Sequence, residues 1–194
     1  VNGEKISKSL GNTITLEDIE ARGIPLEAFR LHVLESHYRS QSKFSWESLE
    51  AAHNRLQNFY SLAVLRWQPV ASEGDHSEYI KEQAQAILSD MQDDFNTPAA
   101  LAKLSALQNK LESELLTASD LDAFEHLLQV LDNLFGLRLL DQADITTEQQ
   151  QAISKRQQAR EAKNWAEADE LRDTLVSEHL AVRDTSHGPI WYRI

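Results

Sequence analysis

Apolar residues recur at intervals of three and four residues through most of the first 140 positions of the chain. This spacing is typical of amphipathic α-helices that each bury one stripe of side chains. It predicts a short helix capped by Thr15 and then five long helices, over 25–37, 45–67, 78–91, 98–115 and 121–135. Long helices joined by short polar turns predict a helical bundle, and the apolar interior positions suit a rigid spacer better than a small-molecule site.

Two polar segments lie between these helices. In Asp93-Asp94-Phe95-Asn96-Thr97-Pro98, an N-cap oxygen from Asn96 or Thr97 precedes a proline in the first turn. We favour capping over a cation site, because the Gly and Glu positions of a calcium loop are missing. The segment His37-Tyr38-Arg39-Ser40 ends the preceding helix. An aromatic and an arginine that lock a turn are favoured there over a contact with RNA, and both interpretations stay open.

The pattern changes after Leu140. Helices are predicted over 147–163 and 165–179 with a tight junction at Asn164, and alternation over 180–194 around a Gly-Pro turn predicts a β-hairpin. The predicted fold class is therefore mainly α, a bundle of about five helices followed by a small α+β unit made of a helix pair and a C-terminal β-hairpin.

Composition narrows the class of protein. The 194 residues include no cysteine, which excludes disulfides and thiolate metal sites, and no apolar run approaches the length of a membrane span. We therefore expect a cytoplasmic protein with no membrane partner. No two of the seven histidines are three or four residues apart, and none is assigned to a metal.

The net charge of −12 argues against RNA binding until its distribution is considered. Residues 71–144 carry fifteen acidic and four basic residues, whereas residues 1–70 carry eight of each and residues 145–194 carry eight acidic and seven basic. The two ends of the chain can therefore contact a polyanion, while the middle is a solvated acidic face.

The first candidate site is the opening loop. Lys5 and Lys8 are separated by small residues, with Ser7 and Ser9 adding hydroxyl donors between flanking glycines. Such a mobile, donor-rich loop can close over a polyphosphate, and a solvated Lys/Ser loop is an equal alternative.

The second candidate site is near the other end. Trp165 offers a stacking platform, Arg160 a planar donor fork, and Asp169 and Asp184 acceptors for exocyclic amines, which together suit single-stranded base recognition. Trp165 and Asp169 share a helix face, whereas Arg160 has to reach across the junction. A tryptophan buried between two helices, with exposed charged pairs around it, is the alternative.

The motifs together resemble a known family. Lys5-Ile6-Ser7-Lys8-Ser9 resembles the Lys-Met-Ser-Lys-Ser signature of class I aminoacyl-tRNA synthetases, with Ile6 in the methionine's place. Leu10-Gly11-Asn12, the two turn segments and the 160–173 segment extend the resemblance to the cysteinyl-tRNA synthetases along essentially the whole chain. That family's nucleotide-binding domain lies upstream of the signature and Val1 is not a methionine, so we expect a C-terminal portion beginning at the catalytic loop.

The resemblance implies roles for both sites. Lys5 and Lys8 would be catalytic, Lys8 more strongly, and would bind ATP together with Ser7 and Ser9. The anticodon of tRNA(Cys) would be read by Arg160, Trp165, Asp169 and Asp184. The enzyme's zinc would belong to the catalytic domain missing from this chain. That catalytic domain is the second expected partner, beside the tRNA.

The resemblance also implies a division of the chain. Residues 1–14 would be a catalytic-loop remnant, 15–140 a stem-contacting, DALR-like bundle, and 141–194 an anticodon-binding domain. We expect mobility in residues 1–14 and no cysteine activation by the chain alone. Two alternatives stay open: part of a ligase that joins cysteine to a small amine, in which the 160–184 set should be missing, and a helical interaction module.

Overall fold

The computed structural model describes residues 13–68 and 71–194. Four residues predicted to bind ATP, Lys5, Ser7, Lys8 and Ser9, lie outside this part of the chain. The same holds for nearly all of segment 1–14, for which mobility is expected.

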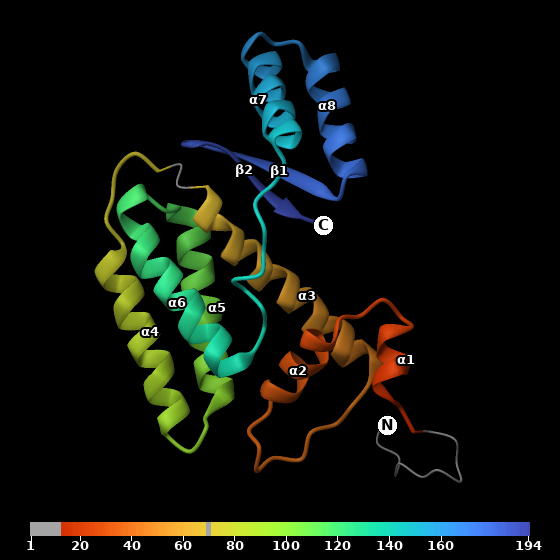
Figure 1. The fold of residues 1–194 in the computed structure, drawn as a ribbon, viewed down its shortest axis with the longest axis vertical. Coiled ribbons are helices and arrows are strands. Elements are labelled where there is room, and N and C mark those ends of the chain that lie inside the picture. The colour runs from red at the N-terminus through yellow and green to blue at the C-terminus, as the bar shows by residue number, and fades with distance from the viewer. Residues whose placement is uncertain (1–12, 69–70) are drawn as a thin grey trace.

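The first two thirds of the chain form the predicted helical bundle (Figure 1). Its helices are α1 (Leu16–Glu20), α2 (Leu26–Leu34), α3 (Trp46–Ala63), the 3₁₀ helix η2 (Val64–Trp67), α4 (Ser77–Gln92), α5 (Thr97–Glu114), the 3₁₀ helix η3 (Ala118–Asp120) and α6 (Leu121–Phe135). Helix α4 packs against both α5 and α6, and α3 runs from beside α1 and α2 to the opposite end of the bundle. The predicted helix over 25–37 is wrong at its end, because helical hydrogen bonding stops three residues earlier.

Capping side chains begin three of these helices, and a glycine ends another. Thr15 accepts from the Asp18 amide, Ser45 from the Ser48 amide and Asn96 from the Ala99 amide. Gly136 follows α6 in the left-handed conformation, with φ of 61°, where a glycine avoids the steric cost of a Cβ atom. The local sequence therefore sets most helix boundaries.

The core of the bundle is built mainly from leucine and phenylalanine, and α4 contributes Ile80, Ala84 and Ile87. On α2, Ala28, Leu31 and His32 are buried, whereas Val33 is 51% exposed although it fits the apolar spacing of the helix. Trp67 is also a large apolar residue that is not buried, at 42% exposure. Its indole Nε1 donates to the carbonyl of Gln142 at 3.1 Å.

The two polar segments singled out in the sequence contact each other. The Tyr38 hydroxyl donates to Asp94 Oδ1 at 2.6 Å, Arg39 Nη2 lies 3.0 Å from the same oxygen, and His37 Nε2 lies 3.1 Å from the Asp94 carbonyl. Asp94 and Phe95 both have positive φ, 55° and 51°. The α2–α3 and α4–α5 turns are thus held together, as the structural interpretation of these segments requires.

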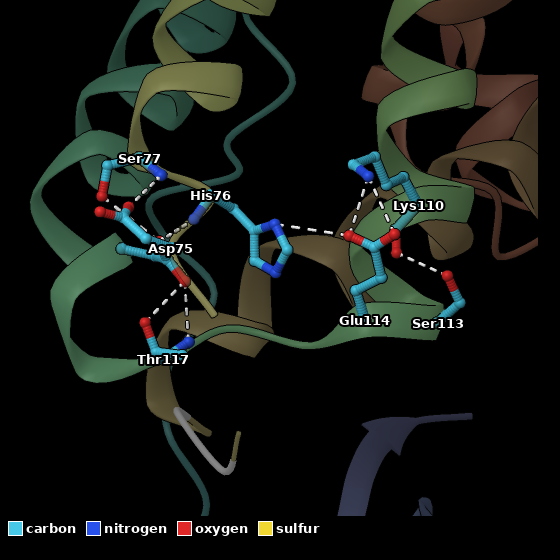
Figure 2. A network of polar contacts seen from close by, with 8 residues as sticks. Asp75, His76, Ser77, Lys110, Ser113, Glu114 and Thr117 are labelled. Carbon is cyan, nitrogen blue, oxygen red and sulfur yellow. Dashed lines mark hydrogen bonds and ion pairs between the residues drawn. The ribbon is translucent and has the colours of Figure 1, made fainter. Parts of the chain in front are cut away.

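A second polar network closes the opposite end of the bundle (Figure 2). Asp120 is fully buried and accepts from the His76 amide at 2.7 Å and the Thr117 amide at 2.9 Å. The His76 ring points the other way, with Nδ1 3.4 Å from Glu114, which also pairs with Lys110. The start of α4 is therefore tied both to η3 and to the end of α5.

The remaining residues form a smaller unit, here called the C-terminal unit. It comprises α7 (Thr147–Glu161), α8 (Trp165–Ser177), β1 (Leu180–Thr185) and β2 (Gly188–Arg193). The strands pair antiparallel, with Val182 opposite Trp191. Its own core contains Val64, Ile145, Ile153, Leu175, Leu180 and Trp191. This architecture confirms the predicted fold class.

Candidate nucleic-acid interface

The junction between α7 and α8 is a tight left-handed turn. The Lys163 amide donates to the Arg160 carbonyl at 3.0 Å and the Asn164 amide to the Ala159 carbonyl at 2.8 Å, which is the Schellman pattern of helix termination. Lys163 takes the left-handed position with φ of 58°. The chain therefore reverses within three residues and brings the end of α7 beside the start of α8.

Replacing Lys163 with glycine is expected to stabilise the protein by about 0.5–1 kcal/mol, because a non-glycine residue in this conformation carries a steric cost of roughly 1–2 kcal/mol. Thermal unfolding followed by circular dichroism would measure the change. Lys155, exposed in the middle of α7, is the matched control. Lys155→Gly should instead cost about 1 kcal/mol. A lower midpoint for Lys163→Gly would contradict the assignment.

The turn and the hairpin bring three of the four predicted anticodon residues together. Arg160 Nη2 lies 3.3 Å from Asp184 Oδ2, and the Arg160 guanidinium carbon lies 5.7 Å from the centroid of the Trp165 ring. Trp165 is 57% exposed, so the alternative of a tryptophan buried between the helices is wrong. A flat indole face next to a guanidinium is thus presented to solvent.

A fifth residue, the buried Arg156, contacts this cluster through Asp184, and the sequence analysis missed it. Arg156 is 5% exposed and makes two parallel hydrogen bonds to Asp184, at 2.8 and 3.0 Å. It stands one helical turn before Arg160, on the same face of α7. That spacing is the one sequence signal that could have indicated it. Asp184 thus accepts two hydrogen bonds from Arg156 and forms an ion pair with Arg160, which holds Arg160 beside Trp165.

The same contacts fix the charge of the carboxylate. Hydrogen bonding from Arg156 lowers the pKa of Asp184, burial acts in the opposite direction, and the charges of Arg156 and Arg160 lower it further. The pKa of Arg156 is raised, chiefly by its hydrogen bonds to Asp184. The pair is therefore fully ionised at neutral pH.

Asp169 occupies a different place in the cluster. It lies one turn after Trp165 on α8, its side chain is 63% exposed, and it forms an ion pair of 3.1 Å with Arg172. Within residues 13–68 and 71–194, no hydrogen bond or ion pair joins it to the other three predicted residues. Its negative charge adds to the raised pKa of Arg156, after the larger effects of hydrogen bonding and charge from Asp184.

These residues have the chemistry that base recognition requires. Stacking of an unpaired base on an exposed indole contributes about 1–3 kcal/mol. The fork of Arg160 can donate to base carbonyls or ring nitrogens, and the exposed carboxylate of Asp169 can accept from exocyclic amines. Because both arginine and carboxylates flank the ring, the surface favours hydrogen-bonded bases over a bare phosphate backbone.

Other kinds of site receive no support from the part of the chain that the structure describes. Within it, no group of three or more His, Asp or Glu residues is placed to hold a metal ion. No helix among the described residues is long and apolar enough to cross a membrane.

Comparisons with known proteins agree with this geometry. Residues 142–193 match the family model described as the cysteinyl-tRNA ligase anticodon binding domain, and residues 86–140 match the DALR domain. The first of these matches contains Arg156, Arg160, Trp165, Asp169 and Asp184.

Curated relatives match along the whole chain. A cysteine–tRNA ligase of Legionella pneumophila is 36% identical over 203 residues, covering 100% of this chain and 42% of the relative. Those of Idiomarina loihiensis and Pseudomonas aeruginosa are 34% and 35% identical, covering 43% and 42% of their own lengths. The chain thus spans less than half the length of the curated relatives it matches.

Proposed function

Because this chain belongs to the cysteinyl-tRNA synthetase family and is similar to its anticodon-binding portion, we propose that it binds tRNA(Cys) for a cysteine–tRNA ligase. In that reaction cysteine is activated with ATP and transferred to the tRNA. The C-terminal unit reads the anticodon, and the bundle contacts the stem. These 194 residues would not activate cysteine without the nucleotide-binding domain.

The observation that carries the proposal is the exposed Trp165 ring beside Arg160 and Asp184. Three independent elements contribute to this surface, since Arg160 lies in the last turn of α7, Trp165 begins α8 and Asp184 lies on β1. Exposing an indole to water costs free energy, because its apolar area is not buried. A stacked base would recover that free energy, whereas the stability of the unit itself gains nothing from the exposure.

The opening loop completes the proposed function on the catalytic side. Lys5 and Lys8 would stabilise the negative charge that develops as the cysteine carboxylate attacks the α-phosphate of ATP, with Ser7 and Ser9 adding hydrogen bonds. The support for this role is the sequence motif itself. Zinc, in this proposal, belongs to the catalytic domain.

We propose the same division of the chain as its sequence indicates: 1–14 as part of the catalytic loop, 15–140 as the stem-contacting bundle and 141–194 as the anticodon-binding domain. The C-terminal unit has its own apolar cluster, to which Val64 is the one contributor from before residue 141 among the buried residues that the structure describes, and this supports the second boundary. The cytoplasm, where tRNA is charged, is the proposed location.

Trp165→Ala is expected to weaken binding of tRNA with a GCA anticodon about tenfold or more, because one stacking platform is lost. The fold should persist, since the ring is exposed. Filter binding at a stated salt concentration would compare this tRNA with the same tRNA carrying another anticodon. Trp165→Ala should also reduce the preference between the two.

Val176→Ala is the matched control, because Val176 is an exposed residue on the same helix, at 44% exposure. Its effect on tRNA affinity should be less than about twofold. Equal affinity of the parent chain for both tRNAs, unaffected by Trp165→Ala, would favour the helical interaction module instead.

A further inference from the structure

The bundle and the C-terminal unit each contribute a buried side chain to the apolar core of the other. Val64, in the η2 turn that continues α3, is 1% exposed and belongs to the core of the C-terminal unit. Ile190, on β2, is 4% exposed and belongs to the core of the bundle. Each unit therefore covers part of the other's apolar surface, and their relative placement depends on this joint.

Gln68 joins the two units at the same place. Its side chain is buried, and its Nε2 donates to the Trp191 carbonyl at 2.9 Å while its Oε1 accepts from the Trp191 amide at 2.6 Å. Nε2 also lies 3.2 Å from the Val64 carbonyl. The amide is thus oriented by its own turn and makes two opposed hydrogen bonds to one residue of the hairpin.

These hydrogen bonds pair two backbone groups of the hairpin, the amide and the carbonyl of Trp191. Trp191 faces Val182 across the two strands, yet its own amide and carbonyl bond to Gln68 on the open edge of β2. Trp191 is 6% exposed, so without Gln68 both groups would be buried and unpaired. Leaving a buried backbone group unpaired is unfavourable, which makes the pairing selective for one orientation of the hairpin.

Neighbouring contacts extend the joint to the segment that connects the units. Arg66 Nη2 donates to the carbonyls of Leu140 and Gln142, each at 2.7 Å. Figure 1 shows this connecting segment, between α6 and α7, passing the end of α3 on its way to the C-terminal unit. Helix α3 has 18 residues, or about 27 Å, so it links the joint to the region near α1 and α2.

We propose that Gln68 is a positioning residue for tRNA binding, which fixes the orientation of the C-terminal unit on the bundle so that one tRNA contacts both. The inference rests on the proposed function. A tRNA held by two surfaces gains affinity only when their spacing and angle match it, because the second contact is then made at high effective concentration. Loosening the joint should reduce that gain and leave the anticodon surface intact.

Gln68→Met tests this proposal in the full chain, since it preserves side-chain length and removes both hydrogen-bonding groups. Binding would be measured for whole tRNA with a GCA anticodon and for its anticodon stem-loop alone. We expect about a tenfold loss for whole tRNA and less than a twofold change for the stem-loop. Gln129→Met, at an exposed glutamine on α6, should change neither.

Orientation can be measured without RNA. The chain has no cysteine, so Glu125→Cys on α6 and Glu170→Cys on α8, both exposed, supply two spin-label positions, one in each unit. Double electron–electron resonance should give one narrow distance distribution with Gln68 present and a broader or shifted one in the Gln68→Met variant. An unchanged distribution would overturn the proposal.

A second variant tests whether the effect of Gln68→Met is caused simply by unfolding. Arg66→Met removes the bonds to Leu140 and Gln142 while leaving Trp191 paired, and the same split between whole tRNA and stem-loop is expected. Equal losses for both RNAs in both variants would overturn the inference, because Gln68 would then support folding and not orientation. If the parent chain bound no tRNA, the proposed function would be refuted. The distance distribution would still show whether Gln68 fixes the orientation of the C-terminal unit on the bundle.

Discussion

Replacing Arg156 with alanine is expected to destabilise the C-terminal unit by about 2–3 kcal/mol, because Asp184 loses two charge-assisted hydrogen bonds while it keeps Arg160 as a partner. The side chain of Arg156 is 6% exposed, so water cannot fully replace the lost hydrogen bonds. Urea unfolding monitored by tryptophan fluorescence would measure the effect. Binding of tRNA should fall as well, since Arg160 is held through Asp184.

Arg172→Ala is the matched control in the same unit. Arg172 is about half exposed and pairs with Asp169 and Asp173 on the surface, so its removal should cost less than about 1 kcal/mol. Equal effects of the two substitutions would show that the Arg156–Asp184 pair has no special structural role.

The pair also predicts a pH dependence. The folded-state pKa of Asp184 is lowered, so its contribution is complete above the unfolded value of about 3.9 and is lost as the pH falls through the folded value. The parent chain should therefore lose stability below about pH 4. The Arg156→Ala variant should lose less over that interval, because its Asp184 no longer has the same partner.

Replacing Asp120 with alanine is expected to destabilise the bundle by about 3 kcal/mol. The substitution leaves two backbone amides, of His76 and Thr117, without their acceptor at a site with 0% exposure. Figure 2 shows how His76, Ser77 and Thr117 converge at this end of the bundle. Thermal unfolding by circular dichroism would measure the loss.

Asp122→Ala provides the comparison, because Asp122 is exposed in the first turn of α6 and should contribute only about 0.3–1 kcal/mol through the helix dipole. Burial raises the pKa of Asp120, but hydrogen bonds from Thr117 and His76 outweigh it and the pKa is lowered overall. This contribution too is present above about pH 4 and lost in acid. A loss below 1 kcal/mol for Asp120→Ala would contradict the assigned network.

Much of the fold could be predicted from local pattern. Helical periodicity and caps such as Thr15, Ser45 and Asn96 placed nearly every helix, because a cap bonds to an amide three residues away in the sequence. The end of α2 was predicted less well. Its Val33 fits an apolar stripe, yet which face of a short helix is buried depends on its neighbours.

The candidate site, like the fold, could be predicted only in part from the sequence. Its residue types were evident in the sequence, since Arg160, Trp165 and Asp169 lie within ten positions of one another. The exposure of Trp165 and the role of Arg156 were not, because both depend on how the hairpin packs on the helix pair, and the spacing of Arg156 from Arg160 shows only a shared helix face.

The sequence by itself determined the helices, their caps, the hairpin and the chemistry available at each end of the chain, because periodicity and capping act over three or four residues. The tertiary structure alone decided the pairings between distant residues. Arg156 meets Asp184 28 positions later, Tyr38 meets Asp94 56 positions later, and Gln68 meets Trp191 123 positions later. Such contacts depend on how whole elements pack, and the stabilisation from a buried polar pair exists only once the surrounding apolar surface has excluded water.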